Sequence, residues 1–181
     1  YEEKDEGFTC GINISSDEKY FLIKTSNLTT SEIYFFDVNE ANPKPKLFKK
    51  RQEEIEYSID SWKGNFYIHT NLDAEDFKIC SCKIDNIEKW QDYIPATNGV
   101  LIGGFSLLNE WMVRSEVRDA LSKLYVRNLN TNKEEELIIT DEKVISPGAS
   151  LMQKDRNTNK IYVTYQSPKT PGKTYIYDIL T

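Results

Sequence analysis

Residues 20–26 read Tyr-Phe-Leu-Ile-Lys-Thr-Ser, a run rich in aromatic and branched side chains. The polar stretch Ser16-Asp17-Glu18-Lys19 stands directly before it, and a second alternating run, Ile-Tyr-Phe-Phe-Asp-Val, follows at 33–38. Short runs of this composition between turn residues are typical of β-strands. The region 16–38 therefore predicts two strands joined by a tight loop.

The same layout recurs along the chain. Runs equivalent to the one at Tyr20 begin at Phe66, Trp111 and Ile161, with spacings of 46, 45 and 50 residues (66 − 20, 111 − 66 and 161 − 111). Each is followed by a second alternating run, at 77–83, 124–129 and 174–179. Weaker runs precede these pairs at 10–14, 57–60, 101–107 and 149–153, and others follow at 46–49, 90–94 and 136–139. Only short helical stretches fit the pattern, such as one at 85–89.

Four antiparallel strands in about 45 residues make one blade of a β-propeller. We therefore predict an all-β fold, a partial β-propeller of about four consecutive four-stranded antiparallel blades with the last one incomplete. The domain covers 1–181, with approximate blades at 8–49, 55–94, 100–139 and 147–181. A β-sandwich with accidental spacing is the alternative, and four copies in register argue against it. No Trp-Asp pair closes any copy, which argues against WD40 repeats.

A blade that is apolar on both faces must lie between two neighbours. An open arc of four blades would leave a large apolar face uncovered at each end, which is unfavourable in water. We therefore expect more of the propeller to lie outside these residues.

Charge and composition limit the partners. The net charge is −6, from 23 Lys and Arg against 29 Asp and Glu, which suits nucleic acid poorly. The chain has no apolar run near the roughly 20 residues that a membrane helix needs, and no secretory signal. We expect no nucleic acid and no membrane partner. Three cysteines cannot all pair, and Cys80 and Cys82 stand too close to bridge, so a cytoplasmic location is expected.

No catalytic constellation emerges from the residues. Ser106 and Ser150 follow glycines, but both stretches lack the last Gly of a Gly-x-Ser-x-Gly elbow. The one histidine, His69, falls inside a predicted strand and is expected to be a packed side chain. The acidic group at 73–76 lacks the spacing of a calcium loop, and Glu134-Glu135-Glu136 is interpreted as a solvated turn. We expect no catalytic residue, metal or cofactor in this chain.

Five stretches match a known pattern in their order and spacing. They are the acidic opening at 1–8, Thr30-Ser31-Glu32 between two strands, Glu56–Asp60 before Phe66–Asn71, Glu116-Val117-Arg118 with Leu121, and Tyr165–Pro171. Together they resemble the propeller of oligopeptidase B (protease II), in the prolyl oligopeptidase family of serine peptidases. Gln166 stands where that family usually has Ser, and Asp119-Ala120 stands near a point where Gly is frequent.

The resemblance implies a non-catalytic propeller portion of a serine oligopeptidase that hydrolyses short peptides after Arg or Lys. Its α/β-hydrolase catalytic domain, with a Ser-Asp-His triad, would lie outside this chain. The propeller would gate substrate access, and its loops between the second and third strands would look toward the catalytic domain. Asp76, Glu116 and Arg118 are the candidates for charged contacts there, or for steering basic peptides. The expected partners are that domain and short basic peptides.

Two other functions stay open. A free-standing β-propeller would bind proteins or peptides and perform no chemistry. A sibling aminopeptidase of the same superfamily would keep the fold but differ in specificity.

Overall fold

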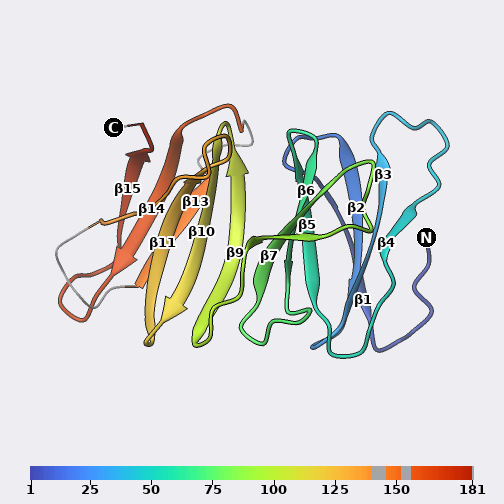
Figure 1. The fold of residues 1–181 in the computed structure, drawn as a ribbon, viewed down its shortest axis with the longest axis horizontal. Coiled ribbons are helices and arrows are strands. Elements are labelled where there is room, and N and C mark those ends of the chain that lie inside the picture. Colours follow the sequence, from blue (N-terminus) through green and yellow to red (C-terminus); the bar gives the residue numbers. More distant parts are fainter. Residues whose placement is uncertain (140–145, 152–155, 181) are drawn as a thin grey trace. The chain divides into compact units, whose positions relative to one another are not determined.

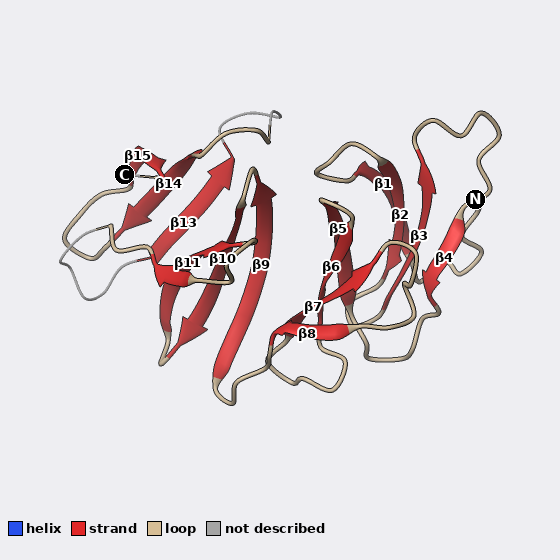
Figure 2. Cartoon of the chain, turned by 45° about the horizontal axis from the view of Figure 1, so that its top comes forward, coloured by secondary structure: helices blue, strands red, loops and turns tan. Residues whose placement is uncertain are grey.

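The computed structural model describes residues 1–139, 146–151 and 156–180, and these residues form only strands and loops (Figures 1 and 2). Fifteen strands make four antiparallel sheets, which confirms the all-β fold of an incomplete propeller. Within the described residues, no helix is long and apolar enough to cross a bilayer. The chain divides into two compact units, Tyr1–Ala96 and Thr97–Thr181, and each holds two sheets.

Within each sheet the strands lie side by side in their order along the chain. The first unit contains β1 (Thr9–Ile14), β2 (Tyr20–Ser26), β3 (Ser31–Asp37), β4 (Lys46–Lys49), β5 (Tyr57–Trp62), β6 (Asn65–Thr70), β7 (Lys78–Lys83) and β8 (Gln91–Ile94). The second contains β9 (Val100–Leu108), β10 (Trp111–Arg118), β11 (Leu121–Asn128), β12 (Glu134–Glu136), β13 (Ser146–Leu151), β14 (Lys160–Gln166) and β15 (Lys173–Asp178). The sheets are β1–β4, β5–β8, β9–β12 and the three-stranded β13–β15.

This order fixes where the loops lie. Because neighbouring strands are antiparallel, the loop between the second and third strands of a sheet lies at the edge where its first strand begins. In a four-stranded sheet the fourth strand ends at that same edge. We call it the loop edge, and its loops are 27–30, 71–77, 119–120 and 167–172.

Aromatic side chains form the core of the first unit. Phe66 on β6 is fully buried, and its ring centroid lies 5.1 to 5.3 Å from those of Tyr20, Phe35 and Phe48. Trp90 packs against the same cluster, with its ring centroid 5.9 Å from that of Phe48. Most of these ring pairs are tilted or edge-to-face, the geometries that the aromatic quadrupole favours. The cluster joins the first sheet to the second.

Hydrogen bonds tie the same two sheets together at both ends. Near the loop edge, the Ser31 hydroxyl donates to the carbonyl of Tyr57 at 2.8 Å and accepts from its backbone N–H at 2.6 Å. At the opposite edge, the backbone N–H of Ser16 donates to the carboxylate of Asp60 at 2.7 Å. Buried polar groups that are paired in this way fix the alignment of the two sheets.

The second unit has an aliphatic core. It joins β9–β12 to β13–β15 and consists of Leu108, Val113, Leu124, Val126, Leu137, Ile161 and Val163, with Trp111 and Tyr177 packed at its border. The indole N–H of Trp111 donates to Asn159 at 3.2 Å, so the border is also hydrogen-bonded. Here, too, facing sheets bury one another's apolar side chains.

Two local predictions are wrong. Residues 85–89 form no helix but two consecutive turns, in which Asn86 N–H donates to the Lys83 carbonyl and Lys89 N–H to the Asn86 carbonyl. The last strand of the third sheet is Glu134–Glu136 rather than 136–139, because Glu134 lies opposite Arg127 and Glu136 opposite Tyr125. Leu137 follows it and turns its side chain into the core.

Truncation of Phe66 tests the aromatic core. We expect Phe66→Ala to lower the free energy of unfolding by about 3–5 kcal/mol, because it leaves a cavity where three aromatic rings meet. Urea denaturation followed by tryptophan fluorescence measures the change, since Trp90 borders the cluster. The control is Leu28→Ala, at a side chain that is 95% exposed, where we expect a change within about 0.5 kcal/mol. Similar losses in both variants would contradict this account of the core.

Candidate functional site

Two of the three candidate residues lie at the loop edge of the third sheet. Glu116 and Arg118 lie near the end of β10, two residues apart and on the same face of the strand. A two-residue turn, Asp119 and Ala120, joins β10 to β11. Both turn residues have positive φ, 51° and 61°, the conformation of a type I′ hairpin. The strands stay paired up to Arg118 and Leu121, so the hairpin is short and its end is well ordered by pairing.

Strand alternation brings a third charged residue onto the same face. Arg114, Glu116 and Arg118 stand two residues apart, so their side chains share one side of β10. Arg114 Nη1 lies 2.8 Å from Glu116 Oε2, and Arg118 Nε lies 3.5 Å from Glu116 Oε1. The structure therefore brings Glu116 and Arg118 together, with Arg114 as the partner that binds Glu116 more closely.

The guanidinium of Arg114 contacts three side chains, those of Glu116, Glu134 and Tyr125. Its Nη2 lies 2.8 Å from Glu134 Oε1 and its Nε donates to Glu134 Oε2 at 3.1 Å, a two-point contact between planar groups. Its guanidinium also stacks 4.4 Å from the ring centroid of Tyr125. The side chains of Arg114 and Glu116 are only 5% and 4% exposed. A buried cation is thus matched by two carboxylates, as low local polarity requires.

Burial and charge oppose each other at Glu116. Burial alone would raise the pKa of its carboxyl, but the hydrogen bond and positive charge of Arg114 outweigh burial and hold the pKa below its usual value. For Tyr125, burial and the charge of Glu116 act in the same direction and raise the pKa to about 12. Glu116 is therefore ionised and Tyr125 neutral near pH 7.

Asp76 belongs to the other unit. It lies in the loop 71–77 at the loop edge of the second sheet and is partly buried. That loop is tightly turned: Ala74 N–H donates to the Asn71 carbonyl, and Phe77 N–H donates to the Ala74 carbonyl, each at 3.0 Å. Asp76 therefore occupies the same place in its own sheet as the turn after Arg118 does in the third sheet.

Sequence reasoning missed Arg114 and Glu134. Arg114 could have been found, because the pattern Arg-x-Glu-x-Arg from 114 to 118 puts three charges on one face of a strand. Glu134 was interpreted as part of a solvated turn, whereas it lies on β12 and carries the second carboxylate of the cluster. Only the pairing of β12 with β11 reveals this contact.

The first unit contains a similar arrangement. Arg51 Nη2 lies 2.5 Å from Glu3 and 3.2 Å from Glu32, and its guanidinium stacks 4.1 Å from the ring centroid of Phe8. The backbone N–H of Asp5 and the guanidinium of Arg51 lower the pKa of Glu3 to about 2. Here an arginine between two glutamates fastens the segment before β1 to the first sheet.

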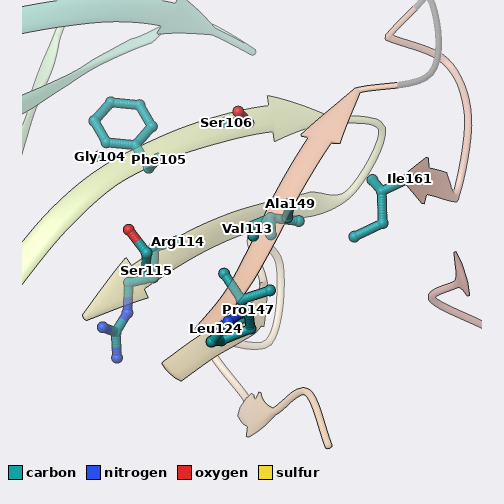
Figure 3. A pocket seen from close by; sticks show the side chains of 11 residues that line it. Gly104, Phe105, Ser106, Val113, Arg114, Ser115, Leu124, Pro147, Ala149 and Ile161 are labelled. Carbon is teal, nitrogen blue, oxygen red and sulfur yellow. The ribbon is translucent and has the colours of Figure 1, made fainter. Parts of the chain in front are cut away.

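A pocket of about 300 Å³ opens between the two sheets of the second unit (Figure 3). Its walls come from β9, β10, β13 and the adjoining strands, and include Ser106, Val113, Pro147 and Ile161. Its shape depends on a bulge, since Arg114 pairs with Phe105 but Glu116 with Ile102. A Cβ at Gly103 would lie 3.1 Å from the Ser115 carbonyl oxygen, so a glycine lets the strands approach there.

Serine, histidine and cysteine side chains that could take part in covalent chemistry occur in both units. Ser106 lines the pocket of the second unit, and the single histidine, His69, belongs to the first unit, where its ring stacks on Phe77 with centroids 4.7 Å apart. The side chain of Ser150 lies outside the described part of the chain. Burial raises the pKa of the Cys80 thiol to about 12 and that of Cys82 to about 11, so neither is a ready nucleophile. Among the described residues, no three His, Cys, Asp or Glu side chains gather in a way that would hold a metal.

Removing the central cation tests the charge cluster. We expect Arg114→Met to lower the free energy of unfolding at pH 7 by about 3–5 kcal/mol, because it leaves Glu116 buried without its counter-ion. Without Arg114, burial raises the pKa of Glu116, so the loss should shrink as pH falls toward 5 and the carboxyl takes up a proton. Urea midpoints at the two pH values measure this.

The matched control is Arg118→Met, which removes a half-exposed cation from the same carboxylate. We expect that variant to lose less than about 1 kcal/mol. A loss in Arg114→Met that does not depend on pH would contradict the electrostatic explanation.

Comparison with known proteins gives one family. The chain matches, over residues 1–181, the family described as prolyl oligopeptidase, N-terminal β-propeller domain. It is 29% identical over 97% of its length to dipeptidyl aminopeptidase BI of Pseudoxanthomonas mexicana, and 24% identical over its whole length to protease 2 of Moraxella lacunata. These matches cover 24% and 26% of the two relatives, so the chain spans about a quarter of their length.

Solved structures show the same fold. Oligopeptidase B from Trypanosoma brucei, in a closed form with covalently bound antipain, matches 100% of the chain and 27% of its own, with a TM-score of 0.91 and 23% identity. Oligopeptidase B from Leishmania major covers 99% of the chain and 27% of its own, with a TM-score of 0.89 and 14% identity. At these identities the likeness establishes the fold alone, and the family match carries the assignment: the chain belongs to the prolyl oligopeptidase family, as part of its N-terminal β-propeller domain.

Proposed function

We propose that this chain is the non-catalytic propeller part of a serine oligopeptidase that hydrolyses short peptides after Arg or Lys. The reaction takes place in an α/β-hydrolase domain outside these residues, and the propeller limits which substrates reach it. One observation supports this division of labour: the chain belongs to the N-terminal propeller domain of a peptidase family.

Strand direction is the observation that carries this proposal. In each complete sheet the first strand begins, and the fourth ends, at the loop edge. Segments that join a propeller built of such sheets to another domain therefore leave from its loop edges. A catalytic domain tethered there would cover the loops that contain or adjoin Asp76, Glu116 and Arg118. These residues would then border the path of a substrate.

Charge supports a preference for basic peptides. The chain carries a net charge of −6, and an acidic surface raises the local concentration of cationic substrates.

The free cysteines also fit the proposed cytoplasmic location, because Cys10 is exposed and unpaired while Cys80 and Cys82 are buried thiols.

One relative favours a second specificity. Dipeptidyl aminopeptidase BI is the more similar of the two relatives described above, and its name indicates release of dipeptides from a free N-terminus. The full-length protein should therefore be assayed on amino-blocked chromogenic peptides ending in Arg or Lys, and on unblocked dipeptide substrates. Our proposal expects turnover of the blocked Arg and Lys substrates. Turnover of the unblocked dipeptides alone would assign the aminopeptidase activity instead, and no peptidase activity on either set would favour a binding module.

Reversal of charge at Asp76 tests electrostatic steering at the loop edge. In the full-length enzyme we expect Asp76→Lys to lower kcat/KM for Arg-containing peptides about three- to tenfold at low salt, with the difference shrinking above about 0.5 M salt. Glu75→Lys, at the exposed neighbouring residue, is the matched control and should have the smaller effect. A kcat/KM and salt dependence equal to those of the unaltered enzyme would remove Asp76 from the proposal.

A further inference from the structure

We propose that Arg118 is a carboxylate-binding group at the loop edge of the third sheet, and that Glu116 positions it. The inference rests on the proposed function in one respect: the carboxylate comes from whatever meets this edge, either the apposed domain or the C-terminus of a bound peptide. The rest of the argument depends on contacts within the second unit.

Four side chains form a row of alternating charge that ends at Arg118. We call it the charge ladder: Glu134, Arg114, Glu116 and Arg118. Glu134 and Arg114 approach to 2.8 Å, Arg114 and Glu116 to 2.8 Å, and Glu116 and Arg118 to 3.5 Å. The two middle side chains are almost fully buried, whereas Arg118 is 48% exposed. The charges in the middle of the charge ladder are therefore paired and buried, whereas the positive charge of Arg118 at its end is half exposed to solvent.

Arg118 has unused donors. Its contact with Glu116 is an ion pair at 3.5 Å through Nε, and its side chain makes no hydrogen bond to any described residue. Oε1 of Glu116, on the other side of that gap, is buried and accepts no hydrogen bond among the described residues. Within the described part of the chain, the contact thus orients the guanidinium by charge and leaves Nη1 and Nη2 outside any ion pair. Those two nitrogens suit the two oxygens of a carboxylate.

The local charge balance also favours an anion. Four cations, Arg114, Arg118, Lys123 and Arg127, share this face with three carboxylates, Glu116, Glu134 and Glu136. Lys123 is paired with Glu136 at 2.8 Å, and Arg127 lies 3.9 Å from Glu134. Among the described residues of this face, Arg114, Arg118 and Arg127 therefore share two carboxylates, Glu116 and Glu134, and Arg118 is the most exposed of the three cations. Arg118 would repel a basic side chain and attract a carboxylate.

The backbone beneath Arg118 is fixed, which reduces the entropy lost on binding. Arg118 pairs with Leu121 across the hairpin and with Val100 on β9. The turn beyond it has only two residues. A guanidinium that starts from a constrained strand end and a neighbouring carboxylate loses less freedom when it binds than one on a long loop.

The direct test uses the Nε–H resonance of Arg118 in the full-length protein. N-acetylglycine supplies a carboxylate, and N-acetylglycinamide is the matched neutral probe. We expect the Nε–H resonance of Arg118 to shift saturably with N-acetylglycine and not to shift with N-acetylglycinamide. Arg118→Gln should remove this resonance, whereas Lys123→Gln should retain both the resonance and its shift. No shift with the acid, or equal shifts with both probes, overturns the proposal. This readout needs no peptidase activity, so its failure is distinct from failure of the proposed function.

Kinetics identify the source of the carboxylate. If it belongs to the substrate, Arg118→Gln raises KM about tenfold for a peptide with a free C-terminus and leaves KM for the C-terminal amide unchanged. If it belongs to the apposed domain, kcat/KM falls equally for acid and amide, and its salt dependence weakens. Lys123→Gln removes one positive charge from the same face and should change neither value. Arg118→Gln kinetics that match those of Lys123→Gln for both peptides overturn the proposal.

A second variant tests the positioning role of Glu116. We expect Glu116→Gln to weaken the acid-dependent shift of Arg118 at least threefold in apparent affinity, although Arg118 itself is intact. A cooperative melting transition, measured alongside, shows that the sheet is still folded at the temperature of the titration. Undiminished affinity for N-acetylglycine in Glu116→Gln would overturn the role of Glu116.

Discussion

A four-stranded sheet has two faces, and the need to cover at least one of them with another sheet shapes both units of this chain. In the first unit, aromatic side chains around Phe66 pack between the two sheets. In the second unit, aliphatic side chains around Val113 and Leu124 do so. Burial of apolar area provides the main favourable free energy in both. Hydrogen bonds such as that between Ser16 and Asp60 then select one alignment of the two sheets among many that would bury similar area.

The repeat could be predicted from the sequence because it is set by burial. Tyr20, Phe66, Trp111 and Ile161 all fall at or near the start of the second strand of a sheet, where the periodic pattern placed them. Outer strands such as β12 were harder to place, because three glutamates carry no apolar alternation and are typical of solvated turns. Their strand character comes from pairing with β11, a contact distant enough in sequence to leave no local signal. The bulge that places Gly103 and Gly104 opposite Ser115 was missed as well, although a glycine inside a strand pattern is a local sign of a bulge.

The charged residues of the candidate site could be predicted from the sequence only in part. Glu116 and Arg118 were chosen because blade geometry put them beside a loop between the second and third strands, yet what makes them a unit is Arg114, which lies two residues before Glu116 on the same face. Pairing across neighbouring strands, rather than position along one strand, brings Glu134 to Arg114. Spacing within a strand can therefore reveal one row of a polar cluster, while the second row depends on register that the sequence alone does not determine.

Arginine between two glutamates occurs in both units, and the two cases differ in what the ion pairs hold. Arg51 fastens the segment that contains Glu3 to the first sheet, beside the side chain of Phe8. Arg114 on β10 reaches past β11 to Glu134 on β12, and its charge ladder ends at the half-exposed side chain of Arg118. Buried ion pairs contribute little net stability, because desolvation offsets most of the Coulomb attraction, but they are costly to break singly. Their useful property is therefore geometric: they hold an exposed guanidinium in one direction without any need for a rigid loop. If the propeller gates a catalytic domain as proposed, a side chain fixed in this way influences the reaction there, because orientation at a shared edge acts on binding and closure rather than on bond cleavage.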